Sequence, residues 1–91
     1  MVAFMSKVVS VYDRKTSMRL TDIEWRILDK ICYREKIRRK NLLELIESNR
    51  PQKLGFTSSV RLFSLLYMYS RPRRPSSSPV YLQKALSLLK W

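Results

Sequence analysis

The sequence contains no histidine and a single cysteine, Cys32. Histidine is the commonest acid–base catalyst and the commonest metal ligand in proteins, so its absence argues against an enzyme and against a metal centre. One cysteine cannot form an intramolecular disulfide, which fits a reducing compartment. Cys32 lies among apolar residues at helical spacing, and we interpret it as a packed thiol. We therefore expect no catalytic residue, no metal ion, no cofactor and no small-molecule substrate.

Long apolar runs are also missing. The longest uncharged stretches, such as "LFSLLYMYS" between Arg61 and Arg71, are about half of the roughly 20 residues that a membrane-spanning helix needs. The first 15 residues are broken by Lys7 and Ser10 and lack a small-residue cleavage site, unlike a secretory signal. We expect a cytoplasmic, nucleoid-associated protein, and a membrane is a disfavoured partner.

Acidic residues are absent after Glu47, although the chain of 91 residues carries a net charge of +12. The C-terminal half therefore holds lysine and arginine with no carboxylate to balance them. Basic blocks of this kind attract nucleic acid or an anionic membrane surface. The charge favours nucleic acid as the partner.

The length and the hydrophobic content of 45% indicate one small folded domain with tails. A chain this short buries only a modest share of its surface and is marginally stable alone. A second chain would therefore help to stabilise it.

The stretch "KTSMRLTDIEW", residues 15 to 25, changes from a strand pattern to a helix pattern. Residues alternate between an apolar face (Thr16, Met18, Leu20) and a polar, cationic face (Lys15, Ser17, Arg19). "TDIE" then predicts a capping box, in which Thr21 and Glu24 satisfy free backbone donors at a helix start. A half-buried strand is thus predicted to run directly into a helix.

The end of this first helix, two further helices and a short C-terminal amphipathic segment are predicted from apolar spacing and from turn residues. The first helix runs to about Glu35, and a short connection, "KIRRKN", leads to a second of roughly Arg39 to Ser48. A third begins near Thr57 or Ser58, either of which can cap it, and continues to about Tyr69. A short amphipathic segment at 80–91 follows a basic proline- and serine-rich linker at 70–79. Residues 1–14 are interpreted as an N-terminal arm or a weak additional strand, ahead of a domain at 15–69.

The predicted strand at 15–20 exposes a row of backbone hydrogen-bonding groups, and no second strong strand is evident in the chain. A second copy could supply the partner. Two antiparallel copies of "KTSMRL" around a two-fold axis would form a narrow ribbon with Ser17 and Arg19 outward. Such a ribbon fits the major groove of B-DNA, where arginine can donate two hydrogen bonds to guanine. The alternative is that Arg19 is an ordinary solvent-facing residue.

One strand, a capped helix, a short turn and a second helix resemble the ribbon-helix-helix DNA-binding family. "TSMRLTDIEW", the spacing to "NLLELIE" and the later "FTSSVRLFSLLYMY" resemble a bacterial branch with a third helix after the core. The resemblance covers residues 15–69. It implies a mainly α fold with one short β-strand, an intermolecular two-stranded antiparallel ribbon in a homodimer, and an extra C-terminal helix.

The resemblance also implies functional residues. DNA bases would be contacted by Lys15, Ser17 and Arg19, and phosphates would be contacted at the start of the second helix. Relatives place a glycine in the turn before that helix and a serine or threonine as its cap, where this chain has Lys36 and Arg38. Either the cap is poorer, or cations hold the phosphate directly. We favour the second interpretation, with Arg38, Arg39 and Lys40 as phosphate contacts.

The apolar residues of the strand and of the first two helices would form the core of the homodimer. The predicted dimer core consists of Met18, Leu20, Trp25, Leu28, Ile31, Leu42 and Ile46. The sequence thus favours a homodimeric, sequence-specific DNA-binding protein, a transcriptional repressor that reads the major groove. An antitoxin-type interaction module, whose residues 80–91 bind a partner protein, is the alternative.

Overall fold

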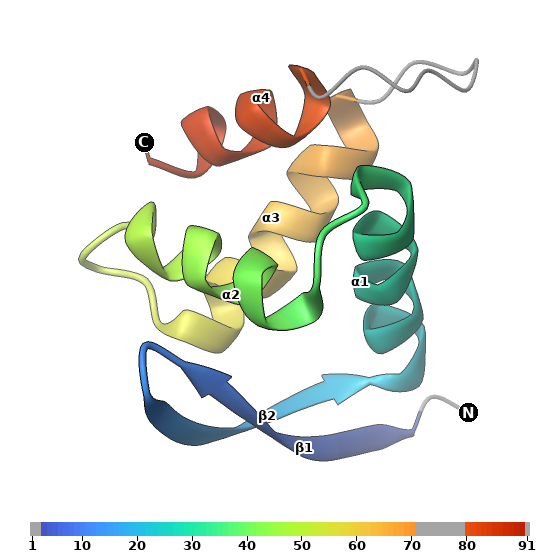
Figure 1. Cartoon of the computed structure of the whole chain (residues 1–91), viewed down its shortest axis with the longest axis vertical. Coiled ribbons are helices and arrows are strands. Elements are labelled where there is room, and N and C mark those ends of the chain that lie inside the picture. Colours follow the sequence, from blue (N-terminus) through green and yellow to red (C-terminus); the bar gives the residue numbers. More distant parts are fainter. Residues whose placement is uncertain (1–2, 71–79, 91) are drawn as a thin grey trace.

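The structure is a computed structural model that describes residues 3–70 and 80–90. A β-hairpin forms one layer, α1, α2 and α3 lie together on one side of it, and α4 lies beyond them, away from the hairpin (Figure 1). In chain order the elements are β1 (Phe4–Val11), β2 (Arg14–Thr21), α1 (Asp22–Glu35), α2 (Arg39–Ser48), α3 (Phe56–Ser70) and α4 (Val80–Leu89).

The hairpin corrects the prediction of a single strand without a partner in its own chain. β1 pairs antiparallel with β2 over their whole length, in a register that runs from Phe4 opposite Thr21 to Val11 opposite Arg14. Residues 4–11, interpreted from sequence as part of an arm or as a weak additional strand, are a strand of the same sheet, which confirms the second interpretation. Their β-branched residues favour the extended conformation once a neighbouring strand is present.

The turn of the hairpin consists of Tyr12 and Asp13, both with positive φ, of 48° and 64°. Two left-handed residues match the right-handed twist of the strands, but they are usually asparagine and glycine. Tyr12 is held there from outside the turn, because its N–H donates to Glu44 Oε2 at 2.9 Å and its hydroxyl donates to the Glu44 carbonyl at 3.1 Å. The same hydroxyl contacts Ser48 Oγ. The hairpin tip is thus attached to α2.

The junction between β2 and α1 is the predicted capping box. Thr21 Oγ1 accepts the Glu24 N–H at 3.1 Å, and Glu24 Oε1 accepts the Thr21 N–H at 2.8 Å. Two backbone donors at the helix start are satisfied in this way, without an intervening loop. The predicted end of α1 at Glu35 and the bounds of α2 are confirmed as well.

The last two helices differ slightly from the sequence prediction. α3 begins at Phe56, so Thr57 and Ser58 lie inside its first turn and do not precede it as caps. α4 confirms a short helix in the C-terminal segment, and its Ala85, Leu86 and Leu89 are buried. The predicted linker falls almost wholly on residues 71–79, which lie outside the described residues.

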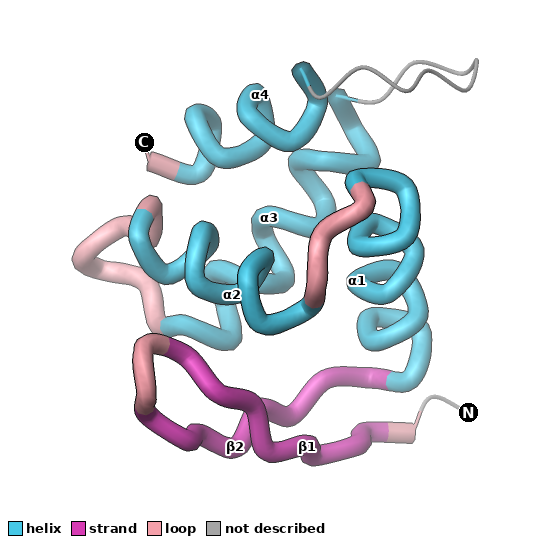
Figure 2. Tube along the Cα trace, viewed as in Figure 1, coloured by secondary structure: helices cyan, strands magenta, loops and turns pink. Residues whose placement is uncertain are grey.

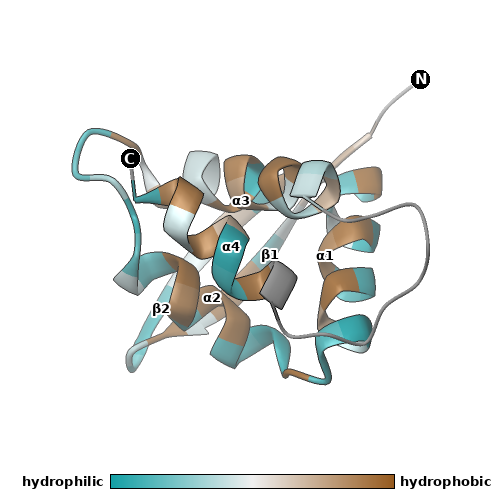
Figure 3. Ribbon diagram, turned by 90° about the horizontal axis from the view of Figure 1, so that it is seen from above, coloured by the Kyte–Doolittle hydropathy of each residue, from teal (hydrophilic) through white to brown (hydrophobic). Residues whose placement is uncertain are grey.

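The core is formed within a single chain by the inner face of the hairpin, α1, α2 and α3, together with the face of α4 that packs on them. All seven residues of the predicted dimer core are buried here, at 2% exposure or less. Apolar and polar stretches alternate along the helices, as amphipathic helices require (Figure 3). Burial of these seven residues therefore does not by itself require a partner, and their role in a dimer stays a prediction.

Tyr67 connects α3 to the end of α1. Its ring is buried beside Phe63, and its hydroxyl donates to Glu35 Oε2 at 2.5 Å. Burial and this hydrogen bond raise the pKa of Tyr67 to about 12. Tyr67 thus belongs to the core, whereas Tyr69, near the end of the same helix, is exposed.

The capping box can be tested by replacing Thr21. We expect Thr21→Ala to reduce the free energy of unfolding by about 1 kcal/mol, because one donor at the start of α1 loses its acceptor. Thr21→Ser retains the hydroxyl and should keep most of the stability. Urea unfolding of the three proteins measures the difference, and equal stability of Thr21→Ala and wild type would contradict the role of the cap.

Candidate nucleic-acid interface

The hairpin has an uncovered face that points away from all the helices (Figure 2). Lys15, Ser17 and Arg19 are exposed, whereas Met18 and Leu20 between and beside them are buried. The alternation predicted for this strand is therefore confirmed for these residues. In the antiparallel register Lys15 lies opposite Ser10, Ser17 opposite Val8, and Arg19 opposite Ser6. We call these six residues the outer face.

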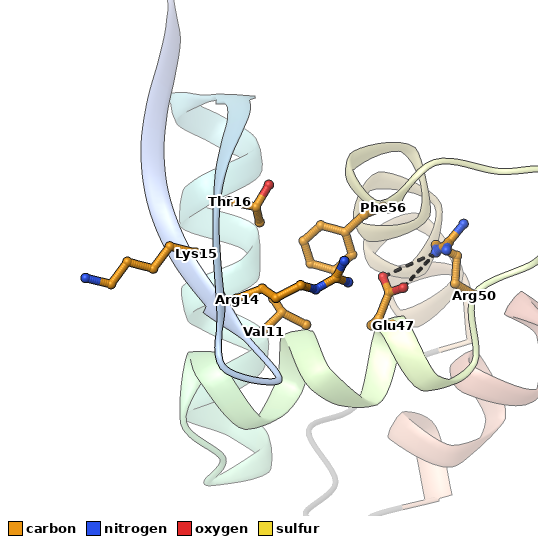
Figure 4. Close-up of a pocket in the computed structure, with 7 residues that line it drawn as sticks. All are labelled: Val11, Arg14, Lys15, Thr16, Glu47, Arg50 and Phe56. Carbon is orange, nitrogen blue, oxygen red and sulfur yellow. Dashed lines mark hydrogen bonds and ion pairs between the residues drawn. The ribbon is translucent and has the colours of Figure 1, made fainter.

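Lys15 and Thr16 are both among the residues around a hollow of about 350 Å³ at the hairpin, and their side chains point in different directions. Lys15 points away from the helices, whereas Thr16 points toward Phe56 at the start of α3 (Figure 4). Thr16 thus belongs to the inner face as predicted, although it is exposed at the edge of the core. The hollow also contains the ion pair between Arg50 and Glu47, with 3.1 Å between Nε and Oε1.

The start of α2 lies beside β1. Arg38 occupies the N-cap position but makes no side-chain cap hydrogen bond. The first backbone N–H groups of a helix lack partners within it, and they favour an anion there. A shallow hollow between this helix end and β1 is lined by residues that include Ser10, Arg39 and Lys40. Arg38 and Lys40 are both exposed, and Lys40 lies at the hollow beside the outer face.

Comparison with known proteins decides the family. A family model described as the ribbon-helix-helix domain matches residues 4–68. The chain belongs to the ribbon-helix-helix family. No curated protein and no solved structure matches the chain.

The family match agrees with the observed elements. It begins at the first residue of β1 and extends through most of α3, so it includes the strand that the sequence interpretation placed outside the domain. Ribbon-helix-helix proteins are in general DNA-binding transcription regulators or antitoxins, and are typically not enzymes. Among the described residues, no helix has the length and apolar character to cross a membrane.

Arg39 differs from its two neighbours in the ribbon-helix-helix domain. Its Nη2 and Nε donate to Asp29 Oδ1 at 2.5 and 3.2 Å, and its guanidinium lies 5.2 Å from the centre of the Trp25 ring. The Lys7 ammonium lies 4.8 Å from that ring, and Trp25 Nε1 donates to the Met5 carbonyl at 2.9 Å. These contacts join β1, α1 and α2. Arg39 therefore has structural partners, whereas Arg38 and Lys40 reach solvent.

The edge of β2 that faces away from β1 lies next to α3. A two-residue turn makes Val11 and Arg14 a hydrogen-bonded pair, so Lys15, Ser17 and Arg19 direct their backbone groups to this edge. Arg61 covers part of it by donating from Nη2 to the Arg19 carbonyl at 3.3 Å. Within residues 3–70 and 80–90, no hydrogen-bond partner is found for the other backbone groups of Lys15, Ser17 and Arg19, which therefore form an open strand edge.

An apolar hollow of about 200 Å³ adjoins this edge between α1 and α3. Its lining includes Ile27, Leu65 and Met68 together with the ion pair of Glu24 and Arg61, whose Oε2 and Nε are 2.9 Å apart. Burial alone would raise the pKa of Glu24, but hydrogen bonds from Thr21 and the charge of Arg61 lower it below its ordinary value. The hollow is thus mainly apolar, lies beside a strand edge and is bordered by the ion pair of Glu24 and Arg61.

Sequence reasoning missed the outer-face residues of β1, namely Ser6, Val8 and Ser10. A partial signal was present, since the valine-rich run of β1 directly precedes Tyr12 and Asp13, and β2 follows them with the same length. The turn lacks glycine and asparagine, so it did not resemble the usual hairpin signal.

The different roles of Arg39 and Lys40 give a direct test. Arg39→Ala should reduce the free energy of unfolding by about 1 kcal/mol, because it removes an ion pair and a contact with an aromatic ring. Lys40→Ala, its exposed neighbour, should leave stability unchanged and is the matched control. Urea denaturation measures both. Equal stability of the two variants would show that the contacts of Arg39 with Asp29 and Trp25 do not stabilise the fold.

Proposed function

We propose that the protein is a homodimeric, sequence-specific DNA-binding protein that represses transcription by occupying its site. The observation that carries this proposal is the outer face, which presents Lys15 and Arg19 on the face of β2 that no helix covers. Arginine and serine on such a strand can form hydrogen bonds to base edges in the major groove. The net charge of +12 adds attraction to the phosphates.

The proposed dimer joins the open edges of two β2 strands. With a two-fold axis beside Ser17, the same residue of each copy would pair, and Lys15 of one copy would pair with Arg19 of the other. The bond from Arg61 to the Arg19 carbonyl would then be replaced by a backbone hydrogen bond. The predicted intermolecular ribbon becomes the central pair of a four-stranded sheet, because β1 already occupies the other edge of β2.

Apolar surface beside the edge supports the same partner. Leu65 is 69% exposed and Ile23 is 55% exposed, and both lie on helices that flank the open edge. A second copy on that edge would bring its own α1 and α3 close to these residues. The edge and the apolar hollow would then form one continuous self-complementary interface.

The width of this four-stranded sheet determines which of its strands would enter the major groove. Four strands at the usual spacing extend about 14 Å between the outermost backbones, and the major groove is about 12 Å wide. The two β2 strands would therefore lie in the groove, with β1 of each copy near its walls. Lys40, which lines the hollow between α2 and β1, and Arg38, the exposed N-cap residue of α2, would contact the phosphates.

Repression by such a dimer requires only occupancy. Base contacts from Lys15, Ser17 and Arg19 would select the site, and phosphate contacts would set the orientation and supply much of the affinity. A two-fold symmetric protein is expected to bind an inverted repeat. We expect the protein to colocalise with the nucleoid.

The antitoxin alternative has less support. It needs a C-terminal segment that is free to bind a partner protein. In the described part of that segment, α4 instead packs on α3 and buries Ala85, Leu86 and Leu89. A partner would have to displace the helix or bind its remaining surface.

Arg19→Ala tests the reading face. We expect it to reduce the preference for the cognate site over random DNA by about 1–3 kcal/mol, because the bidentate contact to a base is lost. Lys84→Ala, at an exposed residue of α4, removes one charge far from the hairpin and should keep the preference. Fluorescence anisotropy with both duplexes measures it. Equal losses on cognate and random DNA for Arg19→Ala would exclude base reading by Arg19.

Leu65→Asp tests the dimer. A carboxylate at this exposed position should not unfold the protomer, but it would be buried without a partner in the proposed interface. Sedimentation equilibrium should therefore give twice 10.9 kDa for the wild type and 10.9 kDa for the variant. Tyr33→Asp, at a residue that is 86% exposed and outside the hollow, is the control and should remain dimeric. A wild-type protein that stays monomeric at micromolar concentration would contradict the dimer.

A further inference from the structure

Val8 is an apolar residue on the outer face, with 70% of its surface exposed. Its neighbours on that face are Ser6 and Ser10 along β1 and Ser17 across the sheet. None of these three gives it an apolar contact. Phe4, the apolar residue of β1 that lies on the same side of the strand as Val8, has partners, because its ring lies 5.0 Å from the Arg19 guanidinium and 6.0 Å from that of Arg61.

We propose that Val8 recognises the 5-methyl group of thymine in the bound duplex. The inference rests on the proposed function, and it adds β1 to the strands that select the sequence. It assigns to β1 a chemistry that the cationic and hydroxyl side chains of β2 do not have. Val8 would make apolar contact where Lys15, Ser17 and Arg19 make hydrogen bonds.

The chemistry of the groove supports this pairing. Base edges in the major groove present hydrogen-bond acceptors, amino donors and a single apolar group, the thymine methyl. Contact between a valine side chain and that methyl removes apolar surface of both from water. The serine hydroxyls around Val8 can form hydrogen bonds with neighbouring polar groups of the DNA. Only the apolar side chain of Val8 would then face the methyl group.

The position of Val8 fits as well. It lies one strand away from Ser17, about 4.8 Å, on the side opposite the proposed two-fold axis. Val8 would therefore approach the wall of the groove rather than its centre. The 5-methyl group is attached on the side of the thymine ring that faces its own sugar–phosphate strand, which is also toward the wall. The apolar groups of protein and DNA would thus meet at the same margin.

Replacement of single thymines by uracil tests this without changing the protein. Uracil lacks the methyl but keeps the base pair and every hydrogen-bonding group. At one thymine position in each half-site, replacement by uracil should weaken binding by the wild-type protein about fourfold. This factor corresponds to the free energy of burying about one methyl group. No loss at any thymine of the selected site would overturn the inference.

A double-mutant cycle assigns the methyl to Val8. In Val8→Ala the same uracil replacement should change the affinity by less than about 1.5-fold, because the shorter side chain no longer reaches the methyl. Ser6→Ala, on the same face of β1, should keep the fourfold loss. An undiminished loss in Val8→Ala would assign the methyl to another residue and overturn the inference.

The outcomes also separate the two proposals. A wild-type protein with no preference among duplexes would overturn the proposed function and the inference together. A protein that prefers one inverted repeat but ignores uracil would keep the proposed function and overturn the inference alone. Thermal unfolding of Val8→Ala verifies that the hairpin remains folded, and the uracil scan with wild type does not depend on that variant.

Discussion

The attachment of the hairpin to the helices is the constraint on which the rest of the structure depends. Two β-strands alone are marginally stable in water. Here the tip is held by the contacts of Tyr12 with Glu44, and β1 is held by the bond from Trp25 to the Met5 carbonyl. These anchors fix which face of the sheet is buried, because a shift of one residue would exchange the two faces. Lys15, Ser17 and Arg19 point outward as a result.

The sequence predicted the helices and the outward residues of β2 because those features depend on local patterns. Thr21 and Glu24 form the expected capping box, and α2 has the predicted bounds. The hairpin could not be predicted in the same way, because its non-glycine turn is stabilised by α2, a segment more than 30 residues away. The partners of Arg39 were likewise hidden, since Asp29 and Trp25 reach it only after α1 and α2 pack. Long-range contacts overrode local turn chemistry in both cases.

An in-chain partner for β2 changes the architecture that a ribbon-helix-helix dimer of this chain would adopt. Each protomer already has a buried core, so association would extend a sheet and cover an apolar hollow without completing the core. From the two-fold axis outward, the edges of β2 would join the two copies, the outer face would contact bases, and the exposed cations at the start of α2 would lie near the phosphates. Base selection would take place near the axis, and phosphate contact at the periphery.

Selection of duplexes from random DNA at about 150 mM salt tests the central claim most directly, because weak, purely electrostatic binding is reduced under this condition. The account predicts that the wild-type protein enriches one inverted repeat. The variant Lys15→Ala/Ser17→Ala/Arg19→Ala, altered only at exposed residues, should enrich none. Recovery of random sequence by the wild type, or of the same repeat by the variant, would contradict the claim that the outer face of the hairpin reads DNA.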